Sequence, residues 1–200
     1  MGKGTSKANL AKANENRDYR IYEAFAFILV EQAQRFSILN TSLDLSIDAP
    51  VYAIDATVID LCLSVFWWGK FRKHKAAVKL HTMFDVRTNI PTFIYVTSGS
   101  VHDVNGLDHF PLEVGSYYVM DKGYIDFGRL HHIHNEEAFF VTRAKDNFKF
   151  VRLSSRKVDK STGIKCDQTV RLKNYKVSLD YPDVIRRIKY NDIDLKMGSI

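Results

Sequence analysis

Two aspartates stand at positions in this sequence where they could support chemistry. Asp55 lies inside the apolar, β-branched run 51–57, and Asp121 ends a second apolar run, 116–121. A carboxylate among apolar strand residues is costly to bury unless it is paired or bound to a metal. If the two strands are neighbours, their carboxylates meet and repel unless cations bridge them. Mg²⁺ takes one or two carboxylates with phosphate oxygens and water, and two such ions promote phosphodiester cleavage.

The alternative is that each aspartate only ends a strand or accepts backbone hydrogen bonds. Spacing alone leaves both interpretations open, because carboxylates in unusual surroundings mark functional sites only statistically.

The elements that would position these aspartates form an α/β pattern. Runs of β-branched and apolar residues predict strands, and apolar residues at helical spacing predict helices. The first three strands follow closely and favour an antiparallel meander, and the order βββαβαβ predicts a mixed sheet flanked by helices. The first helix has Asp18 as its N-cap and an apolar face that is expected to pack on the rest of the chain. Strands are expected at 51–57, 77–86, 92–97, 116–121 and 138–142, and helices at 18–36, 101–110 and 124–135.

Changes in composition divide the chain into successive segments. Between residues 143 and 176 there are eleven Lys and Arg against three Asp, interspersed with short β-like runs. This texture predicts a basic, mostly β subdomain near the C-terminus. The predicted organisation is a mobile segment at 1–17, a helix and linker at 18–50, the α/β core at 51–143, the β-rich subdomain at 144–195 and a tail at 196–200.

Basic residues favour a polyanionic partner. The chain has 29 Lys and Arg against 23 Asp and Glu, a net charge of +6, although a modest positive charge is weak evidence by itself. A basic stretch follows Trp67 and Trp68, and its cations are predicted to contact DNA phosphates; the alternative is a solvated loop and strand face. Lys122, directly after Asp121, is predicted to place a phosphate. The cations of the basic stretch are Lys70, Arg72, Lys73, Lys75 and Lys79.

Other classes of protein are disfavoured by what the sequence lacks. The two cysteines, Cys62 and Cys166, show no metal-binding spacing and indicate neither a zinc module nor a disulfide-stapled secreted fold. No apolar run reaches the 18 to 20 residues or so that a membrane helix needs, and no signal peptide is recognisable, so a cytoplasmic location is expected. The histidines His131, His132 and His134 could suggest a metal cluster, but adjacent and i+2 positions on a helix do not share a face, and they are expected to be surface residues.

Four segments of the sequence resemble one family of proteins. They are Tyr-Ala-Ile-Asp-Ala-Thr around Asp55, Phe-Arg-Lys-His-Lys-Ala-Ala-Val-Lys-Leu-His at 71–81, Ser-Val-His-Asp ending at Asp103, and Met-Asp-Lys-Gly-Tyr-Ile-Asp-Phe beginning at residue 120. These resemble bacterial DDE transposases of the group named after insertion sequence four, over about residues 7–190.

The resemblance implies an RNase H-like sheet that cuts and joins DNA. Asp55 and Asp121 match the first two acidic residues of the triad, with Mg²⁺ as cofactor and Mn²⁺ as its substitute. Residues 144–195 match the place of a β-rich insertion. His102 and Asp103 match a recurring pair, expected to support the metal ligands rather than touch the metal. The implied partner is double-stranded DNA, at insertion-sequence ends and target, and the implied setting is a homo-oligomer at the bacterial nucleoid.

One feature of that family is missing from this sequence. The third acidic residue of the triad is a Glu within Tyr-x₂-Arg-x₃-Glu-x₆-Lys, and no such string occurs here. We therefore expect a truncated copy with impaired cleavage. Three functions stay open: a transposase that cleaves and transfers strands, a non-catalytic DNA-binding remnant, or another RNase H-like nuclease acting on RNA or hybrids.

Overall fold

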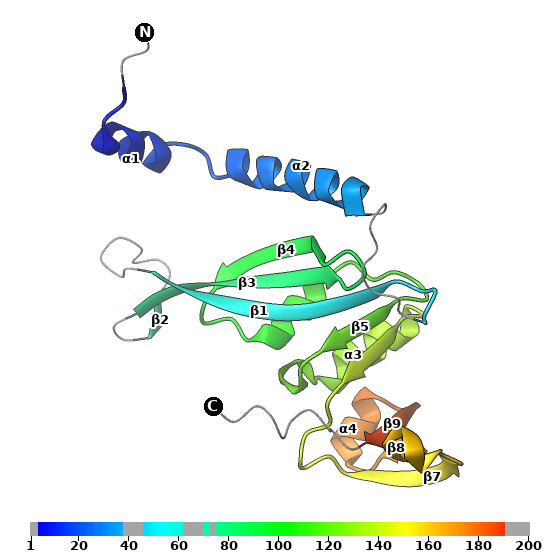
Figure 1. Ribbon diagram of the computed structural model, residues 1–200. Coiled ribbons are helices and arrows are strands. Elements are labelled where there is room, and N and C mark those ends of the chain that lie inside the picture. The colour runs from blue at the N-terminus through cyan, green and yellow to red at the C-terminus, as the bar shows by residue number, and fades with distance from the viewer. Residues whose placement is uncertain (1–3, 38–45, 62–69, 73–74, 191–200) are drawn as a thin grey trace.

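A six-stranded mixed sheet forms the centre of the protein. The computed structural model describes residues 4–37, 46–61, 70–72 and 75–190 (Figure 1). The prediction of a mixed α/β sheet is confirmed, and the strands end within a few residues of the expected positions. They are β1 (Val51–Leu61), β2 (Lys70–Arg72), β3 (Lys75–Asp85), β4 (Ile90–Ser98), β5 (Tyr117–Met120) and β6 (Phe139–Thr142).

The sheet has an antiparallel half and a parallel half that share β1. On one side, β3 pairs antiparallel with both β1 and β4, which confirms the predicted meander, and the short β2 pairs with the outer end of β3. On the other side, β5 pairs parallel with β1, and β6 pairs parallel with β5. The β1–β5 pairing covers only residues 51–54 and 117–120. Beyond residue 54, β1 pairs only with β3 among the strands that the structure describes.

Helices cover one face of the sheet and enclose the core. The 3₁₀ helix η2 (Asp103–His109) follows β4, the single turn η3 (Lys122–Tyr124) follows β5, and α3 (Phe127–Asn135) precedes β6. Asp126 caps α3, because its side chain accepts a hydrogen bond from the Arg129 backbone N–H at 3.0 Å. The core between this layer and the sheet consists mainly of Ile54, Met83, Leu107, Phe110, Tyr118, Met120, Tyr124, Leu130 and Ile133.

The N-terminal region differs from its prediction. A helix that the sequence did not predict, α1 (Lys7–Glu15), occurs in the segment expected to be mobile, and α2 (Arg20–Ser37) matches the expected amphipathic helix with Asp18 at its start. However, α2 buries none of its residues. Its apolar side chains, such as Phe25 and Ile28, are more than half exposed. The helix does contact β4, and Val30 and Ala33 near its C-terminal end are half-buried, so the expected packing is found there but not along most of the apolar face.

A second, three-stranded sheet follows the first (Figure 1). Its strands β7 (Phe150–Arg156), β8 (Ile164–Leu172) and β9 (Val184–Tyr190) pair antiparallel in chain order, as the β-like texture predicted. Gly163, in the turn before β8, has a φ of 82°, a conformation that glycine adopts without strain. The sequence did not predict the short helix α4 (Tyr175–Asp180) between β8 and β9. None of the helices described is long and apolar enough to cross a membrane.

Candidate active site

Parallel pairing brings Asp55 and Asp121 together. The last matched pair of β1 and β5 is Ile54 with Met120, and each aspartate is the next residue of its strand. Neighbouring strands lie about 4.8 Å apart, so the backbones at residues 55 and 121 are adjacent. The structure thus juxtaposes the two carboxylates that the sequence analysis singled out. Both are exposed rather than buried, so the cost of burying them, which the sequence argument invoked, does not arise.

Asp121 is held at the start of the η3 turn. Its Oδ1 accepts a hydrogen bond from the Lys122 backbone N–H at 2.6 Å, and the same atom lies 2.9 Å from the Arg143 guanidinium. The Arg143 guanidinium, followed by the backbone N–H, holds the pKa of the Asp121 carboxyl below its usual range. Asp121 is therefore ionised at neutral pH. The guanidinium of Arg143, the residue that follows β6, is therefore a cation already in contact with Asp121.

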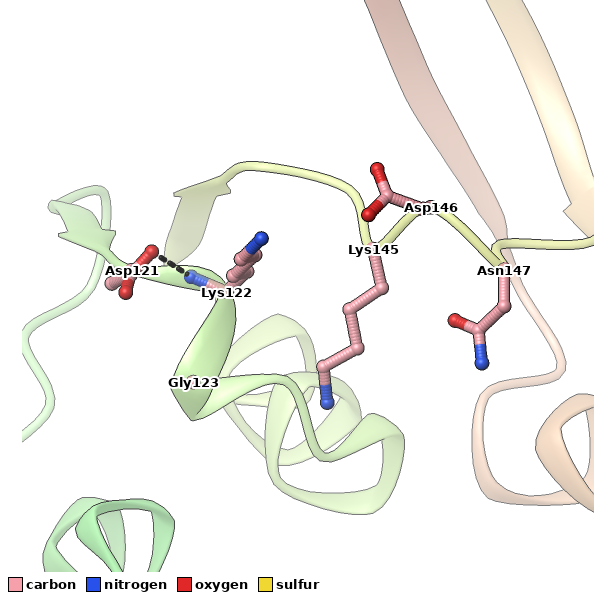
Figure 2. Close-up of a pocket in the computed structure, with 6 residues that line it drawn as sticks. All are labelled: Asp121, Lys122, Gly123, Lys145, Asp146 and Asn147. Carbon is pink, nitrogen blue, oxygen red and sulfur yellow. Dashed lines mark hydrogen bonds between the residues drawn. The ribbon is translucent and has the colours of Figure 1, made fainter.

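An open hollow adjoins Asp121. It encloses about 460 Å³ and is walled by two chain segments, 121–123 and 145–147 (Figure 2). Lys122 and Lys145 both contribute exposed cations, and the Lys145 ammonium also donates to the Ile125 carbonyl at 3.4 Å. A carboxylate bordered by cations suits a phosphodiester that must approach a metal-binding group. Lys122 lines this hollow beside Asp121, and its contact with phosphate stays a prediction.

Tyr124 ends the η3 turn that begins at Asp121, and the sequence analysis gave it no role. Its side chain is only 2% exposed, and its hydroxyl has no hydrogen-bond partner among the residues described. Burial raises the pKa of this phenol, and the nearby charges of Asp103, Asp55 and Asp121 raise it further. The signal was present in the sequence, because Tyr124 completes the Asp-Lys-Gly-Tyr segment.

Asp103, at the start of η2, is held by Lys79. The Lys79 ammonium lies 2.6 Å from Asp103 Oδ1 and donates to the Val101 carbonyl at 2.6 Å. Lys79 is only 8% exposed. Its charge is directed into the protein, whereas the sequence analysis assigned it to DNA. His102, just before Asp103, is exposed.

The rest of the predicted basic stretch is only partly visible. Lys70 and Arg72 lie in β2 and Lys75 begins β3. Their side chains, like the whole of Lys73 and the tryptophan pair at 67–68, lie outside what the structure describes. Their contact with DNA stays a prediction.

His81 and Gly106 fix the position of η2. The imidazole is completely buried, and its Nε2 lies 3.0 Å from Thr97 Oγ1. Burial, followed by the charge of Lys79, lowers the pKa of His81. Gly106 packs so closely that a Cβ there would lie 2.6 Å from His81 Nδ1. This contact holds η2, and with it Asp103, against β3.

Two of the three α3 histidines contact the short segment that links α4 to β9. His134 Nδ1 lies 3.0 Å from the Tyr181 hydroxyl, and His131 Nε2 lies 3.1 Å from Asp183 Oδ2. His134 is exposed and His131 is half-buried, so both lie at the surface as expected, with contacts that the sequence did not predict. His132 is exposed. Within the described ranges, no three His, Cys, Asp or Glu side chains come close enough together to hold a metal ion.

Three arginines of the second sheet make local side-chain contacts. Asp167, which is 6% exposed, pairs with Arg186 at 2.8 Å and with Arg156 at 3.1 Å. The Arg187 guanidinium lies 4.8 Å from the centre of the Phe150 ring. Arg156 and Arg186 remain exposed and share the Asp167 carboxylate, which ties together the three strands β7, β8 and β9.

The donor set at residues 55 and 121 fits a hard divalent cation. Both side chains offer carboxylate oxygens, which Mg²⁺ and Mn²⁺ prefer. Two carboxylates match the number that Mg²⁺ usually takes from protein, leaving its other positions for water and phosphate.

Comparison with known proteins agrees with this arrangement. The family model described as "Transposase DDE domain" matches residues 47–189. The protein named "Putative transposase y4zB" of Sinorhizobium fredii is 30% identical over 193 residues, which cover 92% of this chain and 51% of that protein. The chain thus spans about half the length of this curated relative. No solved structure gives a significant match.

Proposed function

Because the chain belongs to the transposase DDE domain family, we propose that it provides the catalytic core of a bacterial transposase. Its substrate is double-stranded DNA, at the ends of an insertion sequence and at the target, and it works in the bacterial cytoplasm on nucleoid DNA as a homo-oligomer. We further propose that it belongs to the group named after insertion sequence four, which the resemblance of its four segments supports. The observation that carries the proposal is the adjacency of Asp55 and Asp121 at matched positions of β1 and β5.

The architecture supports an RNase H-like assignment. Three antiparallel strands are followed by two parallel ones, with the two aspartates where the halves meet. In this proposal residues 51–143 are the catalytic core, and the sheet within 144–195 is the β-rich insertion.

Asp55 and Asp121 are proposed to hold Mg²⁺, or Mn²⁺ in its place. The bound cation supplies activation of water, and afterwards of the freed 3′ hydroxyl, together with stabilisation of the leaving oxygen. The residues of this chain bind and orient: the two carboxylates fix the cation, while Lys122 and Arg143 hold the phosphate beside it. Arg143 can exchange its Asp121 contact for a phosphate oxygen, because guanidinium binds both groups in the same planar manner.

An exposed apolar surface lies on the same face of the sheet as the two aspartates, and it could bind a helix that carries a third acidic residue. Strand register puts Val119 and Val141 on the same face as Asp55 and Asp121, opposite α3. Val141 and Phe139 are each 51% exposed, and Val119 is 37% exposed. We propose that the helix which the resemblance implies, bearing the third acidic residue, covers this apolar surface and so reaches the two aspartates.

A second candidate function is DNA binding without cleavage. It is favoured by one observation: the described residues contain no set of three metal-binding side chains. A remnant of this kind would occupy DNA ends through its cations, with an affinity that falls steeply with salt.

A nicking assay separates the two candidates. The 200-residue chain is incubated with DNA that carries the element's ends, in Mn²⁺ or Mg²⁺, beside Asp55→Asn and Asp121→Asn. Asp60→Asn is the control, since it removes the same charge from the same strand farther along. Nicking lost in the first two variants only supports the catalytic function. Salt-sensitive binding without nicking in every protein supports the remnant, and nicking that survives both Asp changes refutes the assigned site.

A further inference from the structure

Helix α2 carries an apolar stripe that the rest of the described chain leaves exposed. Its large members have exposed fractions between 48% and 72%, and they are Ile21, Phe25, Ile28, Leu29 and Phe36. The contact of α2 with β4 is made by another side of the helix, where Val30 and Ala33 are half-buried (Figure 1). Monomeric soluble proteins rarely expose so many large apolar side chains together, so the stripe indicates an interface.

The stripe has the spacing of helices that pack in pairs. Four positions on it are separated by four, three and four residues, and they are Phe25, Leu29, Gln32 and Phe36. This alternation is that of the seam positions in a coiled coil. Gln32 is the one polar residue of this seam, and a single polar seam residue fixes the register between two paired helices. The seam therefore suits a partner helix with the same spacing.

Charge favours a second copy of this chain over DNA as the partner. The helix carries Arg20 and Arg35 against Glu23 and Glu31, and the Arg35 guanidinium is paired with Glu31. It is thus neutral, in a chain whose net charge is +6. An apolar stripe on a neutral helix offers little to DNA phosphates, whose binding depends on cations. Two copies of the same helix can meet without charge repulsion.

The stripe is large enough for a contact between two copies. A large side chain has about 150–250 Å² of surface, so the five large members, each about half exposed or more, offer roughly 500 Å² per copy. Two copies would then bury about 1,000 Å², the area at which specific interfaces begin. The seam is short for two free helices, but α2 is already formed and held on β4, which lowers the cost of pairing.

We propose that two copies of this chain associate through α2, with the seam of one helix packed against the seam of the other across a two-fold axis. Each copy presents the same patch, as a two-fold interface requires. The inference rests on the homo-oligomer of the proposed function and names the surface that forms it. Association by this route needs neither DNA nor a divalent cation.

Sedimentation velocity of the 200-residue chain, in EDTA and without DNA, tests this association. The wild type is expected to show a monomer–dimer equilibrium. Phe25→Ser removes a seam side chain and is expected to raise the dissociation constant by at least about tenfold, since a few large side chains dominate most interfaces. Phe27→Ser is the matched control, because Phe27 is 44% exposed and lies about 160° around the helix from Phe25. It is expected to associate as the wild type does.

Circular dichroism shows whether each variant keeps its helices, since serine favours helix less than phenylalanine's neighbours in the seam do. Leu29→Gln keeps a helix-favouring residue and is expected to weaken association as Phe25→Ser does. The inference is overturned if the wild type stays monomeric at every concentration, or if Phe25→Ser and Leu29→Gln associate no more weakly than Phe27→Ser. Failure of the proposed function is distinct, because it appears as absent nicking whatever the oligomeric state.

Discussion

Tyr181 joins the second sheet region to the core, and its replacement by alanine should strongly destabilise the protein. The side chain is 2% exposed. Its ring packs edge-on against His131 and Phe140, with centroids 5.2 and 6.0 Å away, and its hydroxyl bonds to His134. It lies directly after α4, so these contacts tie α4 to α3 and β6.

The expected loss follows from two contributions. Truncating a buried aromatic ring to alanine costs about 3–5 kcal/mol. The hydrogen bond adds only about 0.5–1 kcal/mol, because His134 is exposed and can bond to water instead. We therefore expect Tyr181→Ala to lower the free energy of unfolding by about 4 kcal/mol, and Tyr181→Phe by no more than about 1 kcal/mol. For a chain of this length, 4 kcal/mol corresponds to a melting temperature lower by about 10 °C.

Urea denaturation followed by far-ultraviolet circular dichroism measures both variants. A smaller dependence on urea in Tyr181→Ala would mean that the β7–β9 sheet has separated from the core before the main transition. The reasoning is refuted if Tyr181→Ala costs less than about 1 kcal/mol with an unchanged urea dependence, since the ring would then contribute nothing to docking.

Three further outcomes are expected. Gly106→Ala should cost about 1–3 kcal/mol in urea denaturation, because the new methyl collides with the enclosed His81 ring; a neutral result would show that η2 shifts freely. Guanidinium contacts hold the pKa of Asp167 below its usual value, so its stabilising effect is present above about pH 4 and is lost as pH falls through the lowered pKa. Asp167→Asn should therefore lower stability at pH 7 and flatten the acid branch of the stability profile, and an unchanged profile would contradict this. Arg143→Ala should raise the pKa of Asp121, which NMR titration can follow. It should also strengthen Mn²⁺ binding by no more than about fivefold, as expected for an exposed ion pair. Weaker Mn²⁺ binding in this variant would contradict competition between the Arg143 guanidinium and Mn²⁺ for Asp121.

The sequence was sufficient for the elements that local pattern determines. Asp55 and Asp121 were found because a lone carboxylate in an apolar run is conspicuous, and the meander was found because its strands alternate and follow closely. Their adjacency needed the parallel pairing of β1 with β5, which no local pattern specifies.

Features that depend on three-dimensional packing were missed. Lys79 looked like one more surface cation of a basic stretch, and only the fold shows its ammonium beside Asp103. The apolar face of α2 predicted burial, since periodicity reports what a helix can cover and says nothing of whether a partner surface is present. His134 is exposed as expected, but its contact with Tyr181 was missed because Tyr181 lies far along the chain.

The brief pairing of β1 with β5 also governs the order in which the site can assemble. The meander of β1, β3 and β4 closes short loops, whereas matching residues 51–54 with 117–120 closes a long one and carries a larger entropic cost. Contacts between distant parts of a chain generally form late in folding. We expect the meander to form first and the two aspartates to meet only when β5 docks, so a cation added during refolding would stabilise the finished core and no earlier species.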